Sequence, residues 1–132
     1  MAVHHLHHFN IRAPAAQLDS IRDFYVDVLG LVDGDRPPFR FAGYWLYAGK
    51  HPVVHLMAAR EGQEVPSGTG SIDHVAFACS DYESMCRHLQ QRKIEFRTST
   101  VPGTEQRQVF FRDPIGNGIE LNFTPFDTCS PP

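Results

Sequence analysis

The chain has no long apolar segment, no excess of positive charge and few cysteines. No apolar run approaches the ~20 residues that are needed to span a bilayer, so we expect no membrane partner. The net charge is −3, and the 12 Lys and Arg residues are scattered rather than gathered in a stripe. This distribution gives no electrostatic reason to expect nucleic acid as a partner. The common marks of membrane and nucleic-acid-binding proteins are therefore missing.

The cysteines and the first residues both favour a cytoplasmic location. Cys79, Cys86 and Cys129 make an odd number and lack the spacing of a disulfide framework, which is typical of free thiols in a reducing compartment. The opening Met-Ala-Val-His-His lacks the apolar segment of a signal peptide. We therefore expect a cytoplasmic protein.

The composition is that of a soluble globular protein. Hydrophobic residues make up 42% of the chain and charged residues 20%. A chain of 132 residues is large enough for a real core, and it is most simply one domain. We expect that domain to cover residues 1–126 and to be followed by a loose tail at 127–132.

The two halves of the sequence resemble each other. Residues 6–11 read Leu-His-His-Phe-Asn-Ile, and residues 72–77 read Ile-Asp-His-Val-Ala-Phe. Later in each half, an apolar segment carries one polar residue of a metal-ligating type, His55 in the first half and Glu120 in the second. The offset from His8 to His74 agrees within one residue with the offset from His55 to Glu120, which indicates a duplicated unit.

Each copy is predicted to contain one helix and four strands in the order β-α-β-β-β. In the first module, about residues 4–60, we expect a strand at 4–12, a helix from Leu18 to Leu29 that ends at Gly30, and strands near 31–34, 39–48 and 52–58. In the second module, about residues 71–126, we expect a strand at 71–78, a helix capped by Ser80 or Asp81, and strands near 94–99, 107–112 and 118–124. Residues 61–70 read as the linker, and residues 112–117 as a hairpin turn.

Four residues are candidate metal ligands, because both ends of each module carry a ligand-type side chain. They are His8, His55, His74 and Glu120. Imidazole nitrogen and carboxylate oxygen suit Zn, Ni, Co, Mn and Fe(II). The alternative for each histidine is a hydrogen-bonded structural role, but Glu120 interrupts an apolar strand, and a buried carboxylate needs a partner. His55 is open to two interpretations, a fourth ligand or a catalytic base.

Strand alternation predicts which further residues lie on the same face as the candidate ligands and could line a cleft with them. Phe9 and Ile11 point to one face of the first strand, while His8, Asn10 and Arg12 point to the other. Substrate-binding candidates are Asn10, Arg12, Tyr47, Arg107 and Asn122. The simplest interpretation of Trp45, Phe110 and Phe111 is hydrophobic core.

Four segments together give the chain a family resemblance. They are Leu6-His7-His8-Phe9-Asn10-Ile11, Phe24-Tyr25-Val26-Asp27-Val28-Leu29-Gly30-Leu31, Ile72-Asp73-His74-Val75-Ala76-Phe77, and the stretch from Phe111 to Leu121. The pattern resembles the vicinal oxygen chelate superfamily, which contains glyoxalases, bleomycin-resistance proteins and extradiol dioxygenases. The resemblance covers about residues 6–124.

The resemblance implies a fold and a metal site. The fold is α+β, with two βαβββ modules that form curled mixed sheets around a shared metal-binding cleft. His8, His74 and Glu120 match the three most common ligands, and His55 matches the fourth, where glyoxalase I has a glutamate that also transfers protons. An imidazole at this position argues against lactoylglutathione lyase activity itself. The family also implies a homodimer, which would cover the open edges of the sheets.

The matching motifs are specific for the superfamily but not for one reaction within it. We expect glyoxalase-like lyase or isomerase chemistry on a small substrate that chelates the ion through adjacent oxygens, with Glu120 or His55 moving a proton. The first alternative is a one-domain extradiol dioxygenase that uses Fe(II) with His8, His74 and Glu120. The second is a non-catalytic small-molecule binder of the bleomycin-resistance type, against which the intact ligand set argues.

Overall fold

The computed structural model describes residues 1–68 and 70–124. The chain forms two compact units, the first Met1–Val65 and the second beginning at Pro66, and this boundary lies in the segment expected to be the linker. The organisation into a single domain stays a prediction, and the expected tail at 127–132 lies outside the described residues. None of the helices in the described ranges is long and apolar enough to cross a membrane.

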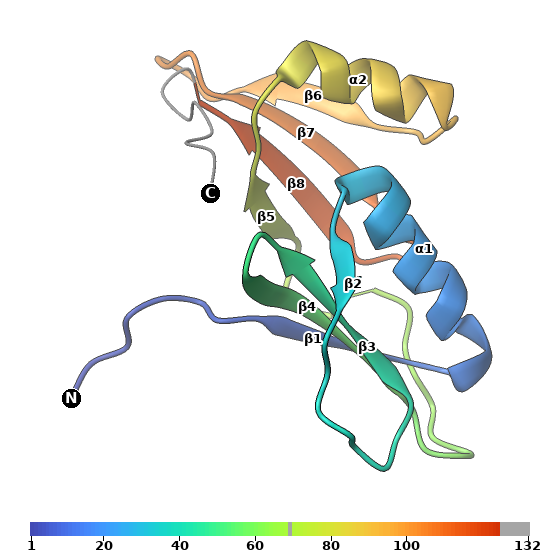
Figure 1. Ribbon diagram of the computed structural model, residues 1–132. Coiled ribbons are helices and arrows are strands. Elements are labelled where there is room, and N and C mark those ends of the chain that lie inside the picture. The colour runs from blue at the N-terminus through green and yellow to red at the C-terminus, as the bar shows by residue number, and fades with distance from the viewer. Residues whose placement is uncertain (69, 125–132) are drawn as a thin grey trace. The chain divides into compact units, whose positions relative to one another are not determined.

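The first unit is one helix and a four-stranded sheet (Figure 1). The elements are β1 (Phe9–Ala13), a short 3-10 helix (Ala15–Gln17), α1 (Leu18–Leu29), β2 (Val32–Gly34), β3 (Gly43–Ala48) and β4 (His51–Ala58). The strand order is β1-β4-β3-β2. Strand β1 runs parallel to β4, and the other two pairs are antiparallel.

The second unit repeats this plan. Its elements are β5 (Val75–Ala78), α2 (Tyr82–Gln91), β6 (Arg97–Thr100), β7 (Arg107–Arg112) and β8 (Gly118–Phe123). The strand order is β5-β8-β7-β6, again with one parallel pair, β5 with β8. The predicted βαβββ module is therefore confirmed in both halves, and so is the α+β class with two open mixed sheets.

The helix boundaries follow from capping residues that the sequence shows. Gly30 adopts the left-handed conformation with φ 72°, and its N–H reaches the carbonyls of Tyr25 and Val26 at the end of α1. Asp81 begins α2 by accepting a hydrogen bond from the Ser84 N–H at 3.2 Å. Of the two predicted caps for α2, Ser80 and Asp81, the structure selects Asp81.

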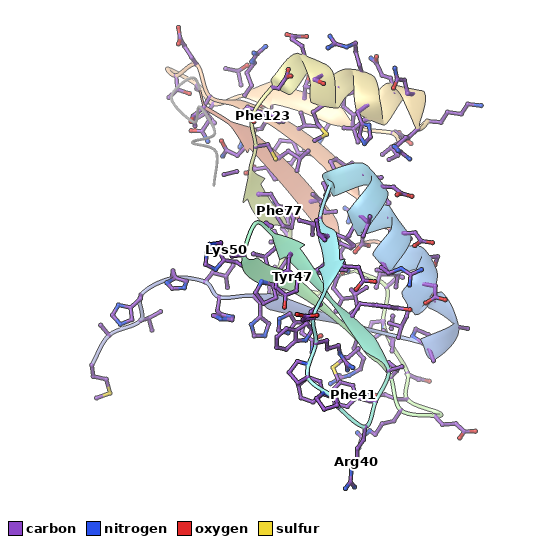
Figure 2. All side chains as sticks on the ribbon, in the orientation of Figure 1. Arg40, Phe41, Tyr47, Lys50, Phe77 and Phe123 are labelled. Atoms are coloured by element: carbon purple, nitrogen blue, oxygen red, sulfur yellow. The ribbon has the colours of Figure 1, made fainter. Side chains whose placement is uncertain are left out.

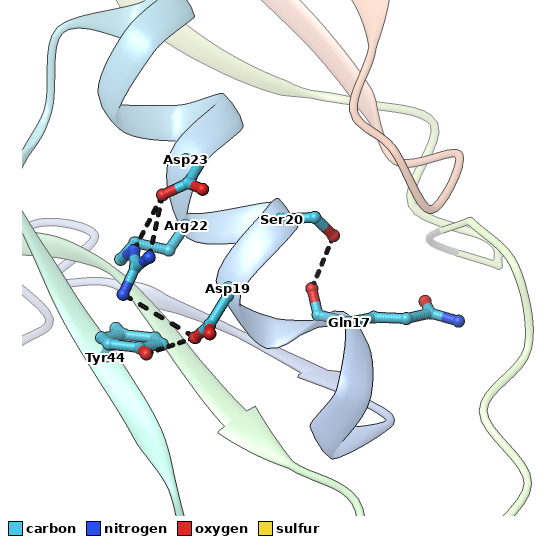
Figure 3. A network of polar contacts seen from close by, with 6 residues as sticks. All are labelled: Gln17, Asp19, Ser20, Arg22, Asp23 and Tyr44. Carbon is cyan, nitrogen blue, oxygen red and sulfur yellow. Dashed lines mark hydrogen bonds and ion pairs between the residues drawn. The ribbon is translucent and has the colours of Figure 1, made fainter.

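The N-terminal end of α1 is also tied to its sheet by side chains (Figure 3). The Tyr44 hydroxyl of β3 donates a hydrogen bond to Asp19. Arg22 lies over the Tyr44 ring, with its Cζ 4.6 Å from the ring centroid, and forms an ion pair with Asp23 at 3.0 Å. The Asp19 hydrogen bond is the main cause that raises the pKa of Tyr44, so the phenol stays protonated and keeps donating.

Each core lies between one helix and one face of the adjoining sheet. In the first unit Ile21 and Tyr25 of α1 are fully buried, as are Leu46 and Val54 of the sheet. In the second unit the fully buried side chains include Leu89 of α2, Val109 of β7 and Leu121 of β8. Alternation then places His55 and Glu120 on the opposite faces, which no helix of their own unit covers within the described ranges.

The hairpin between β7 and β8 is built around one carboxylate. Asp113 is 5% exposed and accepts hydrogen bonds from the backbone N–H groups of Ile115 and Asn117 and from the Asn117 side chain. The predicted hairpin at 112–117 is confirmed. This turn fixes where β8 begins, and therefore which face of the sheet receives Glu120.

Four strands begin at least three residues later than predicted: β1, β3, β5 and β6, with β3 starting at Gly43 rather than near residue 39. Pairing of β1 with β4 starts at Phe9 opposite Val54, and earlier residues would lie beside Pro52, which has no N–H to donate. Strand β8 begins at Gly118, so its partner β5 begins at Val75 rather than at 71. Strand β6 begins at Arg97 rather than at 94, because the residues before it end α2. Lys93 has φ 57°, and the Ile94 N–H donates a hydrogen bond back to the Leu89 carbonyl.

Candidate metal-binding site

The first pair of candidate ligands lies in the first unit. His55 is on β4, and its ring stacks on His8 with centroids 3.8 Å apart and planes 11° apart. The Trp45 ring of β3 also stacks on His55, at 4.2 Å and 13°. Two rings this close and this parallel must lie on opposite faces of the imidazole, since on one face they would overlap. His55 is therefore held between His8 and Trp45.

The buried imidazole of His55 has an unused nitrogen. The residue is 9% exposed, and Nε2 is buried with no hydrogen-bond partner among the described residues. A buried polar atom without a partner is costly, and such atoms often mark an ion or ligand site. Burial lowers the pKa of His55, and the neighbouring His8 lowers it further. The ring is therefore kept neutral, which is the form that binds a metal.

The second pair of candidate ligands lies in the second unit. His74 directly precedes β5, and its Nε2 is 3.8 Å from Oε1 of Glu120 on β8. Glu120 is 6% exposed, and Gln108 of β7 donates a hydrogen bond to the same oxygen at 2.7 Å. The Phe110 ring meets the His74 ring edge-on, with centroids 6.0 Å apart.

An acidic neighbour orients His74. Oδ2 of Asp73 is 2.8 Å from Nδ1 of His74. The hydrogen bond from His74 is the main cause that lowers the pKa of Asp73, so this carboxylate is ionised and acts as the acceptor. With Nδ1 donating to Asp73, Nε2 is the nitrogen of the ring that faces Glu120. Carboxylate–histidine pairs of this kind orient metal ligands in many proteins.

His74 and Glu120 fit a divalent ion by their chemistry, whereas His8 and His55 are suitable nitrogen donors that stack face to face, so their in-plane lone pairs do not point to one ion in this arrangement. Neighbouring ligands on one ion that bind at about 2.0–2.2 Å stand roughly 3–3.5 Å apart, and the separation of 3.8 Å between His74 and Glu120 is close to this value. Among the described residues no three His, Cys, Asp or Glu side chains gather into a metal-sized cluster. Each unit therefore offers a pair of ligand-type side chains, and the expectation of one four-ligand site stays a prediction.

Three of the five predicted substrate-binding residues, Asn10, Arg12 and Asn122, lie on the same strand faces as the candidate ligands, and the fourth, Tyr47, has its hydroxyl engaged elsewhere. Asn10 is the register partner of His55, and Arg12 follows it on the same face of β1. Asn122 lies two residues after Glu120 on the same face, and its Oδ1 is buried without a partner among the described residues. Tyr47 donates its hydroxyl proton to the Asp35 carbonyl at 2.6 Å, so this group is already used.

The fifth residue, Arg107, lies on the other face of its sheet from Glu120. It pairs with Phe123, whose ring meets Tyr82 of α2 edge-on, and this is the helix-covered face. Arg107 forms an ion pair with Glu83 at 3.1 Å, and its Cζ lies 3.9 Å from the Tyr82 ring centroid. The structure does not bring Arg107 to the Glu120 pair, because it lies one step out of phase with Gln108, the β7 residue that contacts Glu120.

Three residues that contact the candidate ligands were missed by sequence reasoning. Asp73 has a visible signal, since it directly precedes a candidate ligand. Gln108 has a weaker one, because hairpin register places it diagonally across from Glu120. Trp45 was expected in the core, but it lies on the His55 face. Phe111 is buried as expected, at 5% exposure, while Phe110 lies beside His74.

A pocket opens next to the second pair. It has a volume of 510 Å³, within the common range for small-molecule sites. Its lining includes Asp73, His74, Arg97, Phe110 and Arg112. Arg97 lies over the Phe110 ring, with its Cζ 4.0 Å from the centroid. The pocket combines apolar walls with cationic groups beside a candidate ligand.

Comparison with known proteins identifies the family. Residues 5–121 match the model of the Glyoxalase/Bleomycin resistance protein/Dioxygenase superfamily. Glyoxylase I 4 of Arabidopsis thaliana is 31% identical over 110 residues, which are 79% of this chain and 63% of that protein. The chain thus spans less than two thirds of this relative.

Two solved structures have a similar fold at low sequence identity. One is the genomically encoded fosfomycin resistance protein FosX from Listeria monocytogenes, with a TM-score of 0.69 at 12% identity and coverage of 95% of this chain and 97% of that one. The other is TnmS3, an antibiotic-binding protein from Streptomyces, with a TM-score of 0.63 at 23% identity and coverage of 94% and 98%. Together with the family match, the repeated βαβββ modules show that this chain belongs to the glyoxalase/bleomycin resistance protein/dioxygenase superfamily.

Proposed function

We propose that this protein is a divalent-metal-dependent enzyme with glyoxalase-like lyase or isomerase chemistry. Its substrate is a small molecule that chelates the ion through two adjacent oxygens. The observation that carries this proposal is the pair of ligand-type side chains at the same two positions of each module, His8 with His55 and His74 with Glu120. The proposed ion takes both pairs, from one chain or across a homodimer.

Each pair has a feature that a purely structural role does not explain. The buried Nε2 of His55 has no hydrogen-bond partner among the described residues. Glu120 keeps a buried carboxylate beside a histidine that Asp73 already orients. Both are expected of ligands that hold their positions before the ion arrives. The ion would be Zn, Ni, Co, Mn or Fe(II), which nitrogen and oxygen donors accept.

The chain's own residues supply the proton transfer. When bound, the ion supplies Lewis-acid stabilisation of negative charge on the substrate oxygens. Glu120 takes the proton from the hydroxyl-bearing carbon beside the substrate carbonyl and returns it to the carbonyl carbon, while the hydroxyl proton passes to the former carbonyl oxygen, so that ketone and alcohol exchange places without a change in composition. Gln108 holds Oε1 of Glu120 by a hydrogen bond at 2.7 Å, which fixes the rotation of the carboxylate and leaves Oε2 for the proton. His55, if it is not a ligand, is the alternative base.

Two other functions give different experimental results. Two histidines and one carboxylate, here His8, His74 and Glu120, also suit an extradiol dioxygenase that uses Fe(II). A fold shared with an antibiotic-binding protein suits a non-catalytic small-molecule binder. We place all three functions in the cytoplasm, because the cysteines of the sequence lack the spacing of a disulfide framework.

Metal loading followed by two assays separates these functions. Protein stripped with EDTA is reloaded with each ion in turn, its metal content is measured by mass spectrometry, and turnover is assayed with hemithioacetals and with catechols. Isomerised hemithioacetal with a bound ion supports the proposal. A coloured ring-cleavage product with Fe(II) selects the dioxygenase, and absence of any retained ion selects the binder.

A control is needed because the N-terminus contains further histidines. His4, His5 and His7 are exposed and could bind metal on their own. A variant with all three changed to Ala should retain the same metal content and activity as the unchanged protein. If its metal content falls to zero, the ion belongs to the N-terminus and the proposal is wrong.

A further inference from the structure

An aromatic row extends from the first candidate ligand pair across one face of the first sheet. His8, His55 and Trp45 stack with nearly parallel planes. Phe39 follows, with its centroid 6.3 Å from that of Trp45, and Phe41 stacks on Phe39 at 5.1 Å and 13°. We call Trp45, Phe39 and Phe41 the aromatic row. It begins at His55 and ends in the loop between β2 and β3.

The outer part of this row is not core. Phe39 is 45% exposed and Phe41 is 42% exposed. The core of this unit lies on the opposite face of the sheet, against α1, where Leu46 and Val54 are fully buried. Figure 2 shows Phe41 in the loop between β2 and β3, away from α1. Large exposed aromatic side chains that adjoin one another favour a binding surface.

The loop that carries Phe39 and Phe41 is held in place by Arg36. The Arg36 guanidinium donates a hydrogen bond to the Phe41 carbonyl at 2.9 Å. Its Cζ lies 4.9 Å from the Phe39 centroid and 5.1 Å from the Phe41 centroid, at cation–π distance. Gly43 permits this approach, since a Cβ there would lie 2.2 Å from the Leu56 carbonyl oxygen and 3.0 Å from the Arg36 guanidinium.

Arg36 also has an unused donor. Its Nε is buried and has no hydrogen-bond partner among the described residues. Arg12 lies on the same face of the sheet as His55, as the β1–β4 register shows. The face that carries the aromatic row therefore combines flat apolar surfaces with two cationic side chains. This combination suits an occupant that has a planar ring and negatively charged oxygens.

We propose that the aromatic row binds the part of the substrate that does not chelate the ion, and that this part is an aromatic ring. The inference rests on the proposed metal-dependent function, because the row begins at His55 and the ring must adjoin the chelating oxygens. The planes of Phe39 and Phe41 lie 13° apart and Trp45 is tilted by 47° from Phe39, so the row presents flat ring faces, which favour contact with an aromatic ring over packing with a branched aliphatic chain. A substrate with adjacent oxygens on or beside an aromatic ring satisfies both parts of the site.

Two α-keto acids test this substrate class because they differ only in the group beside the chelating oxygens. Phenylglyoxylate carries a phenyl ring, and pyruvate carries a methyl group. Binding of each to the metal-loaded protein is measured by calorimetry. We expect phenylglyoxylate to bind about tenfold more tightly or better, from stacking and added apolar burial. Trp45 is the single tryptophan of the chain, so its fluorescence should change with phenylglyoxylate and much less with pyruvate.

Variants then assign the preference to the row. F39A and F41A should each reduce the preference for phenylglyoxylate several-fold, while pyruvate affinity and metal content stay unchanged. F41L, which keeps apolar bulk without a ring, should lose part of the preference. I72A is the matched control, because Ile72 is an exposed apolar residue of the second unit at 60% exposure. It should leave the preference intact.

The outcomes separate this inference from the proposed function. Loss of metal from the unchanged protein would overturn the proposed function. Retained metal with equal affinity for the two acids, or with a preference that F39A and F41A leave intact, would overturn the aromatic subsite alone. A change of molecular mass in F39A or F41A, measured by light scattering, would show that the row is an interface between copies and would also overturn the subsite.

Discussion

At the scale of single residues, His55 can be either a metal ligand or a catalytic base. Its ring is held on both faces by His8 and Trp45, and its Nε2 is buried without a partner among the described residues. We expect H55A to lower metal affinity by about 10–100-fold or more. A loss of this size is typical even when only a residue that supports a metal ligand is removed. Competition titration with a chromophoric chelator measures this loss.

His51 provides the matched control for His55. It begins the same strand, β4, but is exposed. H51A should therefore keep the metal affinity of the unchanged protein. If H55A keeps its metal affinity while turnover falls by about 10²–10⁴, His55 is a catalytic base instead. If neither quantity changes in H55A, its role is structural.

Asp73 is expected to act through His74 rather than on the substrate. Its carboxylate accepts the Nδ1 proton of His74 at 2.8 Å and so presents Nε2 toward Glu120. We expect D73N to lower metal affinity by about 10–100-fold, because an amide can turn its N–H₂ toward the ring and favour the wrong tautomer. E105Q, at another exposed acidic residue of the same unit, should change nothing. Equal metal affinity in D73N and E105Q would refute this role.

At the scale of elements, the N-terminus of α2 combines a cap with a strained backbone. Asp81 has φ 62° and also accepts the Ser84 N–H. D81A should lower the free energy of unfolding by about 1–3 kcal/mol, because it loses the cap and leaves a side chain at positive φ. D81G should cost clearly less, since glycine tolerates this conformation and is itself an acceptable cap. Urea unfolding followed by circular dichroism measures both variants, and a D81G loss as large as that of D81A would contradict this account.

Local signals in the sequence predicted the elements well where one residue determines the outcome. Gly30 ends α1 and Asp113 organises the β7–β8 turn, because a positive φ or a short carboxylate is needed at those points. Strand starts were predicted less well, since they depend on where the partner strand can pair. Pro52 illustrates this dependence, because it lies where β1 would otherwise continue toward His8. Pairing across the sheet is not visible in one segment.

The candidate site shows the same contrast between what one segment reveals and what depends on neighbouring strands. The four ligand-type residues were found from the repeat, because duplication preserves spacing. Arg107 lies away from Glu120 because a phase difference of one residue moves a side chain to the other face of a strand. Trp45, Gln108 and the exposed ring of Phe39 were missed, since their importance comes from neighbours on other strands.

At the scale of the whole molecule, the open sheets predict self-association. Within the described residues, β1 and β2 are the edge strands of the first sheet, and β5 and β6 are those of the second. Unpaired edges are usually covered in native proteins. We expect a homodimer, and light scattering at micromolar concentration should give twice the chain mass of 14.9 kDa. A monomeric mass would contradict this expectation.

We propose that one divalent ion requires ligands from both modules, and metal content tests this most directly. Metal content per chain is measured by mass spectrometry on purified, reloaded protein in which His4, His5 and His7 are changed to Ala, alone and with either H55A or E120A. We expect one ion per chain in the parent and a loss of most of it in both variants, although His55 and Glu120 belong to different units. An ion that survives either change, or a parent that retains none, would contradict the claim.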